Sequence, residues 1–387
     1  MDIRLYTPVD LEAVLELLER SDNTSRTPAT WTGNGMTAAL AFDGDRLVGA
    51  IPVEPRTLCL GGNRAVRALW VSGAHVDEEY RSRGIGTMLD RKLREAFADE
   101  YDAIFVYRAD ETSRAFRWYA RLGFHVLLPV VAYKAKAVST GAPEYRWREG
   151  VAGIEAGEVG LFSRLTRTGA AGGNPLRHAN YWSTRIKSHC YGAFYKHGLL
   201  TVGSDEDPDS YAVLGETTIR DGVKRFDILD HGSPSDRAAW GSLIRAVMDL
   251  AAKRGLEEVR LQLSDEDRAV PWVGGLGFEK RWETNVMGSA IDPPGYLGRE
   301  LRRAGITASI EIETPGLGAC SVGDGEPALR LSMPDVDLTR LLFSRMDLVA
   351  GVEDGRAELR SGDRDVLATV AGCFPKERWE FHQLDYV

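Results

Sequence analysis

Several features that mark common protein classes are rare or missing in this sequence. Its 387 residues include only four cysteines, Cys59, Cys190, Cys320 and Cys373, and no two of them are spaced as in a CxxC motif. Seven histidines are scattered along the chain without an HxxxH pattern. The sequence therefore predicts neither a disulfide framework nor a zinc site, and we expect reduced, buried thiols and no metal cofactor.

Long apolar runs and a basic excess are missing as well. No stretch of about 18 apolar residues is present, and Met1–Arg4 is not the basic start of a signal peptide. The net charge of −9 offers no basic surface for nucleic acid. We therefore expect a cytoplasmic protein with neither nucleic acid nor a membrane as its partner, whose acidity favours cationic amine substrates.

The patterns that are present predict an α/β fold with mixed sheets, over a length that predicts two or three domains. Residues 1–136 alternate between strand and helix patterns and form the first predicted domain. Residues 21–35 are polar and predict a loop. The expected strands cover residues 3–6, 38–42, 46–52, 64–76, 103–107 and the stretch from 124 onward, and the expected helices cover 8–20, 84–98 and 113–122.

A repeat relates the first domain to residues 137–292. The pattern W-x-x-x-L-G-F occurs at Trp118–Phe124 and again at Trp272–Phe278. A helix pattern at 240–254 and a strand pattern at 259–263 precede the second copy, as 86–97 and 103–107 precede the first. This collinear agreement predicts a duplicated domain.

A third domain is expected from residue 293 to residue 387. Pro293-Pro294-Gly295 predicts a break in the chain, followed by a helix at 296–303. Strand patterns at 306–313 and 328–333 and a helix pattern at 335–343, with Asp337 as its expected cap, complete an α+β outline.

The segment Arg81-Ser82-Arg83-Gly84-Ile85-Gly86 carries the clearest chemical signal. It stands between a strand ending near Val76 and an amphipathic helix, so the helix offers free N–H groups and a positive dipole end. The glycines allow an anion to approach the backbone, and the arginines add charge. This arrangement predicts a phosphate site; the alternative is a glycine turn beside surface arginines.

Residues Ala74–Thr87 resemble the central motif of the GNAT acetyltransferase superfamily. The resemblance implies acetyl-CoA or another acyl-CoA as cosubstrate. The pyrophosphate would lie on Arg81, Arg83, Gly84, Ile85, Gly86 and Thr87, and the pantetheine arm would pair with the strand Ala74, His75 and Val76.

The segment Trp118–Phe124 resembles a later helix of the same superfamily, which implies that Tyr119 protonates the departing CoA thiolate. Tyr119 packing as a core residue is the alternative. For His75, a general base competes with the backbone role. Asp22 and Trp31 stand in a loop that borders the acceptor site in GNAT folds, or else in an ordinary surface loop.

The three-part layout resembles the enhanced intracellular survival family of aminoglycoside acetyltransferases. The resemblance implies a catalytic GNAT domain, a degenerate GNAT domain and a sterol-carrier-like C-terminal domain, assembled as trimers or hexamers. It also implies that the Val387 carboxylate acts as a base, assisted by Asp385. The second glycine of this loop, Gly86, is often missing in that family, so the substrate class can differ.

The second copy of the repeat lacks the chemical groups of the first. Its counterpart of the phosphate loop is the acidic stretch Asp230–Asp236, and Val273 stands where Tyr119 stands in the first copy. Acidic side chains repel a pyrophosphate, so one CoA per chain is expected. The sequence thus predicts transfer of an acyl group to a small cationic amine such as an aminoglycoside. A peptide or protein acceptor and a non-catalytic CoA-binding scaffold are the alternatives.

Overall fold

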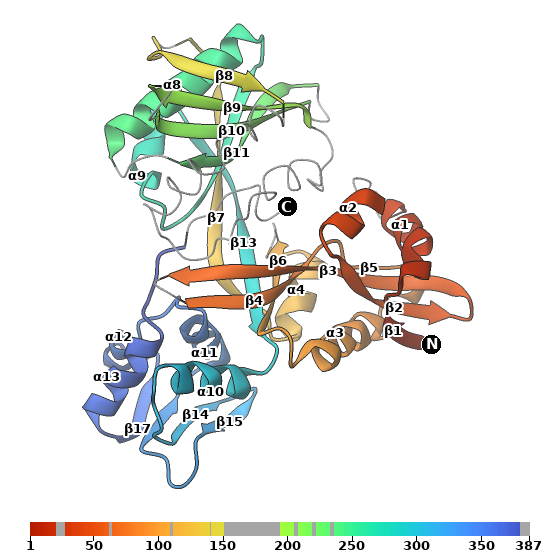
Figure 1. The fold of residues 1–387 in the computed structure, drawn as a ribbon, viewed down its shortest axis with the longest axis vertical. Coiled ribbons are helices and arrows are strands. Elements are labelled where there is room, and N and C mark those ends of the chain that lie inside the picture. Colours follow the sequence, from red (N-terminus) through yellow and green to blue (C-terminus); the bar gives the residue numbers. More distant parts are fainter. Residues whose placement is uncertain are drawn as a thin grey trace.

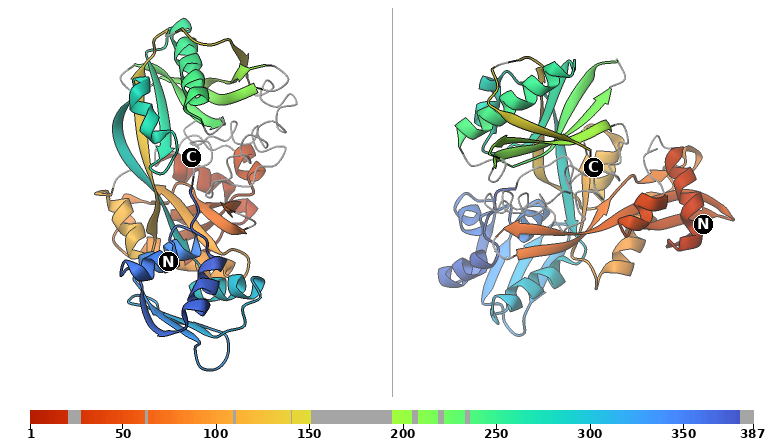
Figure 2. Two further views of the ribbon diagram at one scale, coloured as in Figure 1. Left: turned by 90° about the vertical axis from the view of Figure 1, so that its left-hand side faces the viewer. Right: turned by 45° about the horizontal axis from the view of Figure 1, so that its top comes forward.

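The computed structural model describes residues 1–20, 28–61, 64–108, 111–139, 141–150, 194–204, 208–218, 222–232 and 236–379. Its strands fall into a 13-stranded sheet and a separate four-stranded sheet (Figure 1). The second segment and the C-terminal segment lie at opposite ends of the molecule, with strands of the first segment between them (Figure 2). The fold class predicted from the sequence, α/β with mixed sheets, is confirmed.

The first segment follows the predicted order closely. The strands expected at residues 38–42 and 46–52 and the helix expected at 84–98 are confirmed as β2, β3 and α3. The elements of this segment are β1 (Asp2–Leu5), η1 (Pro8–Asp10), α1 (Leu11–Glu19), α2 (Pro28–Gly33), β2 (Thr37–Asp43), β3 (Arg46–Gly61), β4 (Arg64–Val71), β5 (His75–Val76), η2 (Glu78–Tyr80), α3 (Ile85–Phe97), β6 (Ala103–Arg108), α4 (Arg114–Arg121) and β7 (His125–Lys136).

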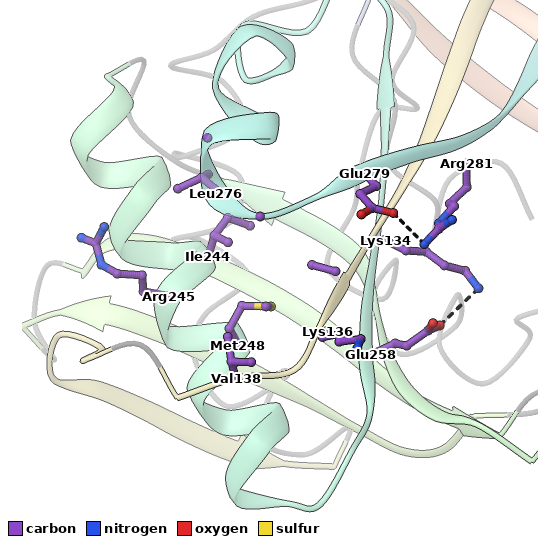
Figure 3. A pocket seen from close by; sticks show the side chains of 13 residues that line it. Lys134, Lys136, Val138, Ile244, Arg245, Met248, Glu258, Leu276, Glu279 and Arg281 are labelled. Atoms are coloured by element: carbon purple, nitrogen blue, oxygen red, sulfur yellow. Dashed lines mark ion pairs between the residues drawn. The ribbon is translucent and has the colours of Figure 1, made fainter.

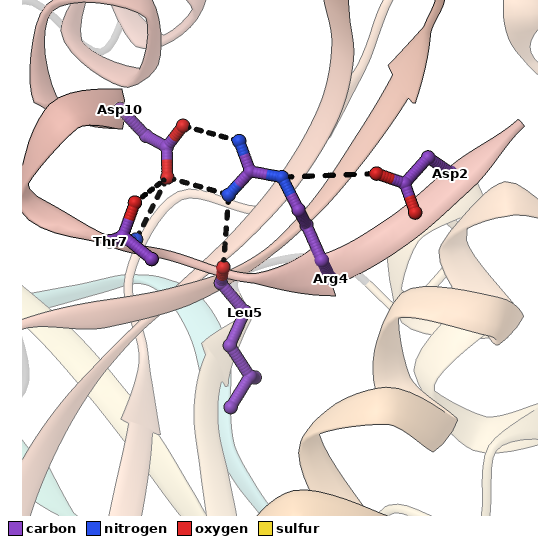
Figure 4. Close-up of polar contacts among 5 residues, drawn as sticks. All are labelled: Asp2, Arg4, Leu5, Thr7 and Asp10. Atoms are coloured by element: carbon purple, nitrogen blue, oxygen red, sulfur yellow. Dashed lines mark hydrogen bonds and ion pairs between the residues drawn. The ribbon is translucent and has the colours of Figure 1, made fainter.

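The entry into α1 is fixed by one buried carboxylate (Figure 4). Arg4 on β1 donates to both oxygens of Asp10, at 2.8 and 2.5 Å, and Thr7 donates to it through its backbone N–H and its hydroxyl. The hydrogen bond from Arg4, opposed by burial and helped by those from Thr7, lowers the pKa of Asp10 to about 2. Asp10 therefore stays ionised at neutral pH and holds η1 against β1.

The single strand predicted over residues 64–76 is wrong, because the structure divides it. Strand β4 ends at Val71, Gly73 adopts the left-handed φ of 89°, and the two-residue strand β5 follows. Both strands pair antiparallel with β3, but of the two only β4 also pairs with β6, through Ala68–Trp70. Among the described residues β5 has no strand on its other side, so one of its edges is open.

The second segment repeats the later part of the first. The predicted helix 240–254 and strand 259–263 are confirmed as α8 and β12. The elements are β8 (Tyr145–Glu149), β9 (Phe194–Gly203), β10 (Pro208–Thr218), β11 (Lys224–Gly232), α8 (Arg237–Lys253), β12 (Glu258–Ser264), α9 (Val270–Val273), η3 (Gly274–Leu276) and β13 (Glu279–Ala290).

The two copies exchange strands within one sheet. Strand β13 of the second segment lies between β6 and β7 of the first, and β7 in turn lies between β13 and β12. Figure 1 shows β7 and β13 running side by side between the two halves. Gly288 permits this arrangement, because a Cβ there would stand 2.5 Å from Leu127 and 2.8 Å from Phe105. The division into domains at residues 136 and 292 stays a prediction.

The C-terminal segment builds the four-stranded sheet in the order β15-β14-β16-β17. Its elements are α10 (Pro293–Arg303), β14 (Ile310–Thr314), β15 (Gly318–Val322), β16 (Leu329–Ser332), α11 (Asp335–Leu342), α12 (Leu348–Glu353), β17 (Glu358–Gly362) and α13 (Arg364–Cys373). Its core continues into the first segment, where Phe105 contacts Phe343 at 5.2 Å and Trp379 at 6.2 Å between ring centroids.

Two details of this segment correct the sequence analysis. Pro293 and Pro294 do not precede helix α10 but form its first turn, where a missing N–H costs nothing, and Asp292 caps it by accepting from Gly295 N at 3.1 Å. Asp337 is not a cap: Pro334 holds that position, and Asp337 is a buried residue inside α11.

Candidate functional site

The open edge of β5 forms one wall of a cavity of about 680 Å³. The other walls are the loop at residues 80–84, the first turn of α3 and one face of α4. The lining residues are Ile51, Ala74, His75, Val76, Tyr80, Arg81, Ser82, Gly84, Ile85, Gly86, Thr87, Arg114, Ala115, Trp118, Arg121 and Leu122. Eight of the nine residues predicted to bind the cofactor lie in this lining, and the ninth, Arg83, does not.

The edge of β5 presents backbone groups to the cavity. Asp77 N–H donates to Val48 O on β3 at 2.8 Å. Because neighbouring residues of a strand direct their backbone groups to opposite sides, the N–H and C=O of Val76 point away from β3. Arg81 Nε donates a hydrogen bond to the Val76 C=O at 3.0 Å. The Val76 N–H is therefore directed toward the side on which the sheet is open.

The loop before α3 is shaped for an anion. Ser82 and Gly84 have φ values of 65° and 78°, so the chain turns sharply into the helix that begins at Ile85. The N–H groups of the first helical turn have no partner within their helix and stand at its positive end. Turns of this kind direct successive N–H groups into one concavity and bind phosphate groups.

The two glycines of the loop serve different purposes. Gly84 is required for its backbone conformation, since nothing lies within 4 Å of the place of a Cβ. Gly86 is required for packing, because a Cβ there would stand 2.8 Å from the Trp118 indole. The second glycine therefore lets α4 approach the phosphate loop, which spacing alone did not indicate.

The charge of the lining is positive. Arg81, Arg114 and Arg121 contribute guanidinium groups, and none of the lining side chains is a carboxylate. Arg83 instead lies over the Tyr80 ring, with 5.1 Å between its guanidinium carbon and the ring centroid. Its predicted contact with the pyrophosphate stays untested.

His75 lies in the lining beside an acidic residue. Its Nε2 is 3.4 Å from Asp77 Oδ1, and Asp77 also accepts from Arg46 at 2.9 Å. Burial lowers the pKa of His75, and the nearby Asp77 offsets this in part. The imidazole is therefore neutral at neutral pH, as a general base requires, although its predicted contribution is through the backbone of β5.

Tyr119 is buried immediately behind the cavity wall. It is only 1% exposed and does not belong to the lining, whereas its neighbour Trp118 and Leu122 do. The Tyr119 ring centroid lies 4.4 Å from that of Trp118 and 5.1 Å from that of Phe124. Its predicted role as an acid stays open, because the aromatic packing would be the same for a core residue.

The predicted acceptor residues fall into two groups. Asp22, Asp385 and Val387 lie outside the described residues. Trp31 lies in helix α2, so the loop predicted for residues 21–35 is wrong at 28–33. Trp31 is 1% exposed and packs against Tyr6 with 5.3 Å between ring centroids, which makes it a core residue in this structure. Its predicted contact with the acceptor stays untested.

Sequence reasoning missed Arg114, Trp118 and Arg121 as a group. These residues follow the spacing i, i+4 and i+7, which places them on one face of a helix. The signal was available in the sequence, but the face could be assigned to a cavity only once the phosphate loop was seen beside α4. A hydrogen bond of 2.8 Å from Arg114 Nη2 to Ser82 Oγ joins α4 to the phosphate loop.

In the second copy, the N–H groups at the start of the corresponding helix, α8, are bound by a side chain of the protein itself. Asp236 caps α8 and accepts from Ala238 N and Ala239 N at 2.8 and 2.9 Å, so its own carboxylate takes the place of a phosphate. Val273, at the position of Tyr119, is buried in the core. These contacts agree with the expectation of a degenerate second copy.

A second cavity, of about 520 Å³, lies farther along α8 (Figure 3). Ile244, Met248 and Leu276 form its apolar side. Two ion pairs cross its rim, Lys134 with Glu258 at 3.2 Å and Arg281 with Glu279 at 2.8 Å. Within the described ranges no group of three or more His, Cys, Asp or Glu residues is arranged to hold a metal.

Residues 10–124 match the model of the acetyltransferase (GNAT) family. The first segment is thus similar in sequence to GNAT domains. The fold of the chain is similar to that of a GCN5-related N-acetyltransferase from Anabaena variabilis, with a TM-score of 0.68, 13% identity and coverage of 98% of this chain and 100% of that one. A GCN5-related N-acetyltransferase from Kribbella flavida has a TM-score of 0.64, with 18% identity over 100% of this chain and 98% of that one.

Eis1 from Mycobacterium abscessus is similar in fold as well, with a TM-score of 0.61 and 17% identity over 99% of each chain. No curated protein matches the sequence. In the described part of the chain, no helix has the length and apolar character needed to cross a membrane. The GNAT domain supports acyl transfer from acyl-CoA to an amine, and the predicted superfamily is supported.

Proposed function

We propose that this GNAT domain transfers an acetyl group from acetyl-CoA to a primary amine of a small cationic acceptor, such as an aminoglycoside. One observation carries the proposal: the open edge of β5 and the phosphate loop before α3 border the same cavity. An extended pantetheine arm needs a free strand edge, and its pyrophosphate needs an anion site at one end of that edge. The layout also favours a relation to the enhanced intracellular survival family.

In the proposed reaction the amine loses a proton and attacks the thioester carbonyl directly. The N–H of Val76 stabilises the oxyanion, because it points toward the open side of the sheet where the thioester would lie. Tyr119 protonates the leaving thiolate. The C–S bond breaks as the C–N bond forms, and no covalent intermediate on the protein is needed. Within the part of the chain that the structure describes, no cysteine lines this cavity.

Reversing the charge of the phosphate loop tests the site. Arg81→Glu and Gly84→Glu each place a carboxylate beside the expected pyrophosphate, so acetyl-CoA affinity should fall by at least about tenfold. Titration calorimetry measures the affinity and should give one equivalent per chain for the unmodified protein. Turnover against a panel of amines, aminoglycosides included, identifies the acceptor.

A matched control is Arg91→Glu on the exposed surface of α3, where Arg91 lies 3.9 Å from Glu95. It makes the same change in net charge as Arg81→Glu, away from the cavity, and should leave affinity within about twofold, since exposed charges are strongly screened. If Arg81→Glu keeps a native circular dichroism spectrum and an unchanged affinity for acetyl-CoA, the phosphate loop is not the pyrophosphate site. Binding of two equivalents contradicts the degenerate second copy, and binding without turnover of any amine favours a scaffold.

The proposed base is the Val387 carboxylate, with Asp385 beside it. Appending a few glycines after Val387 should leave acetyl-CoA affinity unchanged and lower kcat at least about tenfold, because the carboxylate is moved away from the amine. Substituting Val387 by Ala, which keeps the carboxylate in place, is the control. Normal turnover by the extended protein shows that the base lies elsewhere, and His75 is then the next candidate.

A further inference from the structure

Coenzyme A carries a third phosphate that the site described so far does not place. Besides the pyrophosphate, the adenosine ribose bears a 3′-phosphate monoester, which carries close to two negative charges at neutral pH. We propose that Arg114 and Arg121 of α4 form a subsite for this 3′-phosphate and make the protein selective for CoA over 3′-dephospho-CoA. The inference rests on the proposed function, because it assumes a CoA thioester in the cavity.

The position of the two arginines supports this assignment. Both lie in the cavity lining on the α4 wall, whereas the first turn of α3 and Arg81 form the wall assigned to the pyrophosphate. Trp118 lies between them in the sequence and contacts Gly86, so the α4 wall is packed directly against the phosphate loop. The two guanidinium groups therefore border the same cavity from the α4 wall, outside the residues assigned to the pyrophosphate.

Arg114 is held at this place by the loop itself. Its Nη2 donates to Ser82 Oγ at 2.8 Å, and Ser82 is one of the two residues whose positive φ shapes the turn. A guanidinium has five donors in a planar fork, so one bond to a hydroxyl leaves others for a phosphate. The Ser82 contact thus orients Arg114 without neutralising it.

Arg114 and Arg121 also differ in ion pairing from other arginines of the first segment. Arg4 pairs with Asp10, Arg46 with Asp77 and Arg94 with Asp90, each within 2.9 Å. Neither Arg114 nor Arg121 forms an ion pair in the described part of the chain. Two unneutralised guanidinium groups on a wall without a carboxylate attract a dianion, in a chain whose net charge is −9.

The test compares two ligands that differ only in the 3′-phosphate. Titration calorimetry gives the dissociation constants of CoA and 3′-dephospho-CoA for the unmodified protein, for Arg114→Gln, for Arg121→Gln and for the double variant. We expect 3′-dephospho-CoA to bind the unmodified protein about tenfold or more weakly, as the loss of charge-assisted hydrogen bonds implies. In the double variant the two constants should agree within about twofold.

Arg117→Gln is the matched control, because Arg117 is an exposed arginine of the same helix outside the lining. It should keep the full difference between the ligands. General damage to the fold or to the pyrophosphate site weakens both ligands alike and leaves their ratio unchanged. Equal binding of both ligands to the unmodified protein overturns the subsite, as does a difference that survives in the double variant. If the unmodified protein binds neither ligand, the proposed function fails, and the subsite fails with it.

Discussion

Replacing Tyr119 by phenylalanine is expected to lower kcat by roughly 10²–10⁴-fold, the usual contribution of general acid catalysis. The change removes one hydroxyl and keeps the ring that packs on Trp118 and Phe124, so acetyl-CoA affinity should stay within about twofold. Steady-state kinetics and titration calorimetry measure the two quantities separately. A thiolate that leaves without a proton must carry its full charge into the transition state, and the lost rate reports that cost.

Tyr101→Phe is the matched control for this prediction. Tyr101 is a partly buried tyrosine that packs edge-on against Phe97 at 5.7 Å, outside the cavity lining. Its hydroxyl has no expected contribution to catalysis, so kcat should be unchanged. If Tyr119→Phe also turns over within about twofold of the unmodified protein, Tyr119 belongs to the core and the acid lies elsewhere.

The burial of Tyr119 sharpens the test. An acid that is 1% exposed in the free protein must be reached by the leaving sulfur through a small displacement of its neighbours, of which Trp118 is the one in the lining. The Trp118 ring would be that displaced group.

The site was predictable from sequence where one short stretch carries the whole signal. The phosphate loop and helix α3 are local, since glycines, arginines and an amphipathic pattern follow one another within residues 81–97. The break between β4 and β5 was missed, although Gly73 lies in the middle of the predicted strand. An isolated glycine in a strand pattern signals an irregularity, and here it separates the strand that binds β6 from the strand with the open edge.

Other features had no local signal at all. The exchange of β7 and β13 joins residues more than a hundred positions apart, and each strand shows the same apolar pattern whichever neighbour it pairs with. Helix α2 was missed because Trp31 is an isolated aromatic in a polar stretch, and only its contact with Tyr6 explains it. Periodicity thus predicted the elements that have a regular apolar pattern, whereas the partners of each element came from the structure.

The contacts around Arg345, which join all three segments, also had no local signal in the sequence. Arg345 Nε donates to Leu127 O of the first segment at 2.8 Å, and its Nη1 donates to Glu266 of the second at 2.8 Å and to Glu377 O of the third at 2.9 Å. The guanidinium also lies 5.6 Å from the Trp379 ring centroid. The Arg345 side chain is only 5% exposed, whereas that of Glu266 is 32% exposed, so the guanidinium is shielded from water although its acidic partner is not.

Replacing Arg345 by alanine is therefore expected to destabilise the protein by about 1–3 kcal/mol, the usual cost of leaving a buried polar group without its hydrogen-bond partner. The variant leaves the buried Leu127 carbonyl, the part-buried Glu377 carbonyl and the Glu266 carboxylate without their donor. Urea unfolding followed by tryptophan fluorescence measures the effect, as a lower midpoint and an early change in emission when Trp379 is released from the junction.

Arg356→Ala is the control, because it removes an ion pair that is exposed to solvent. Arg356 pairs with Asp354 at 2.8 Å, the same distance as in the Arg345 pair, but its side chain is 42% exposed and that of Asp354 is 50% exposed. Exposed pairs contribute about 1 kcal/mol or less, so the midpoint should move little. Equal midpoints for the two variants would show that Arg345 is hydrated in solution and that the three segments are held together by their shared apolar core. A large difference confined to Arg345→Ala assigns the junction to its buried hydrogen bond, because only there does the lost donor leave a buried carbonyl group, that of Leu127, without a partner.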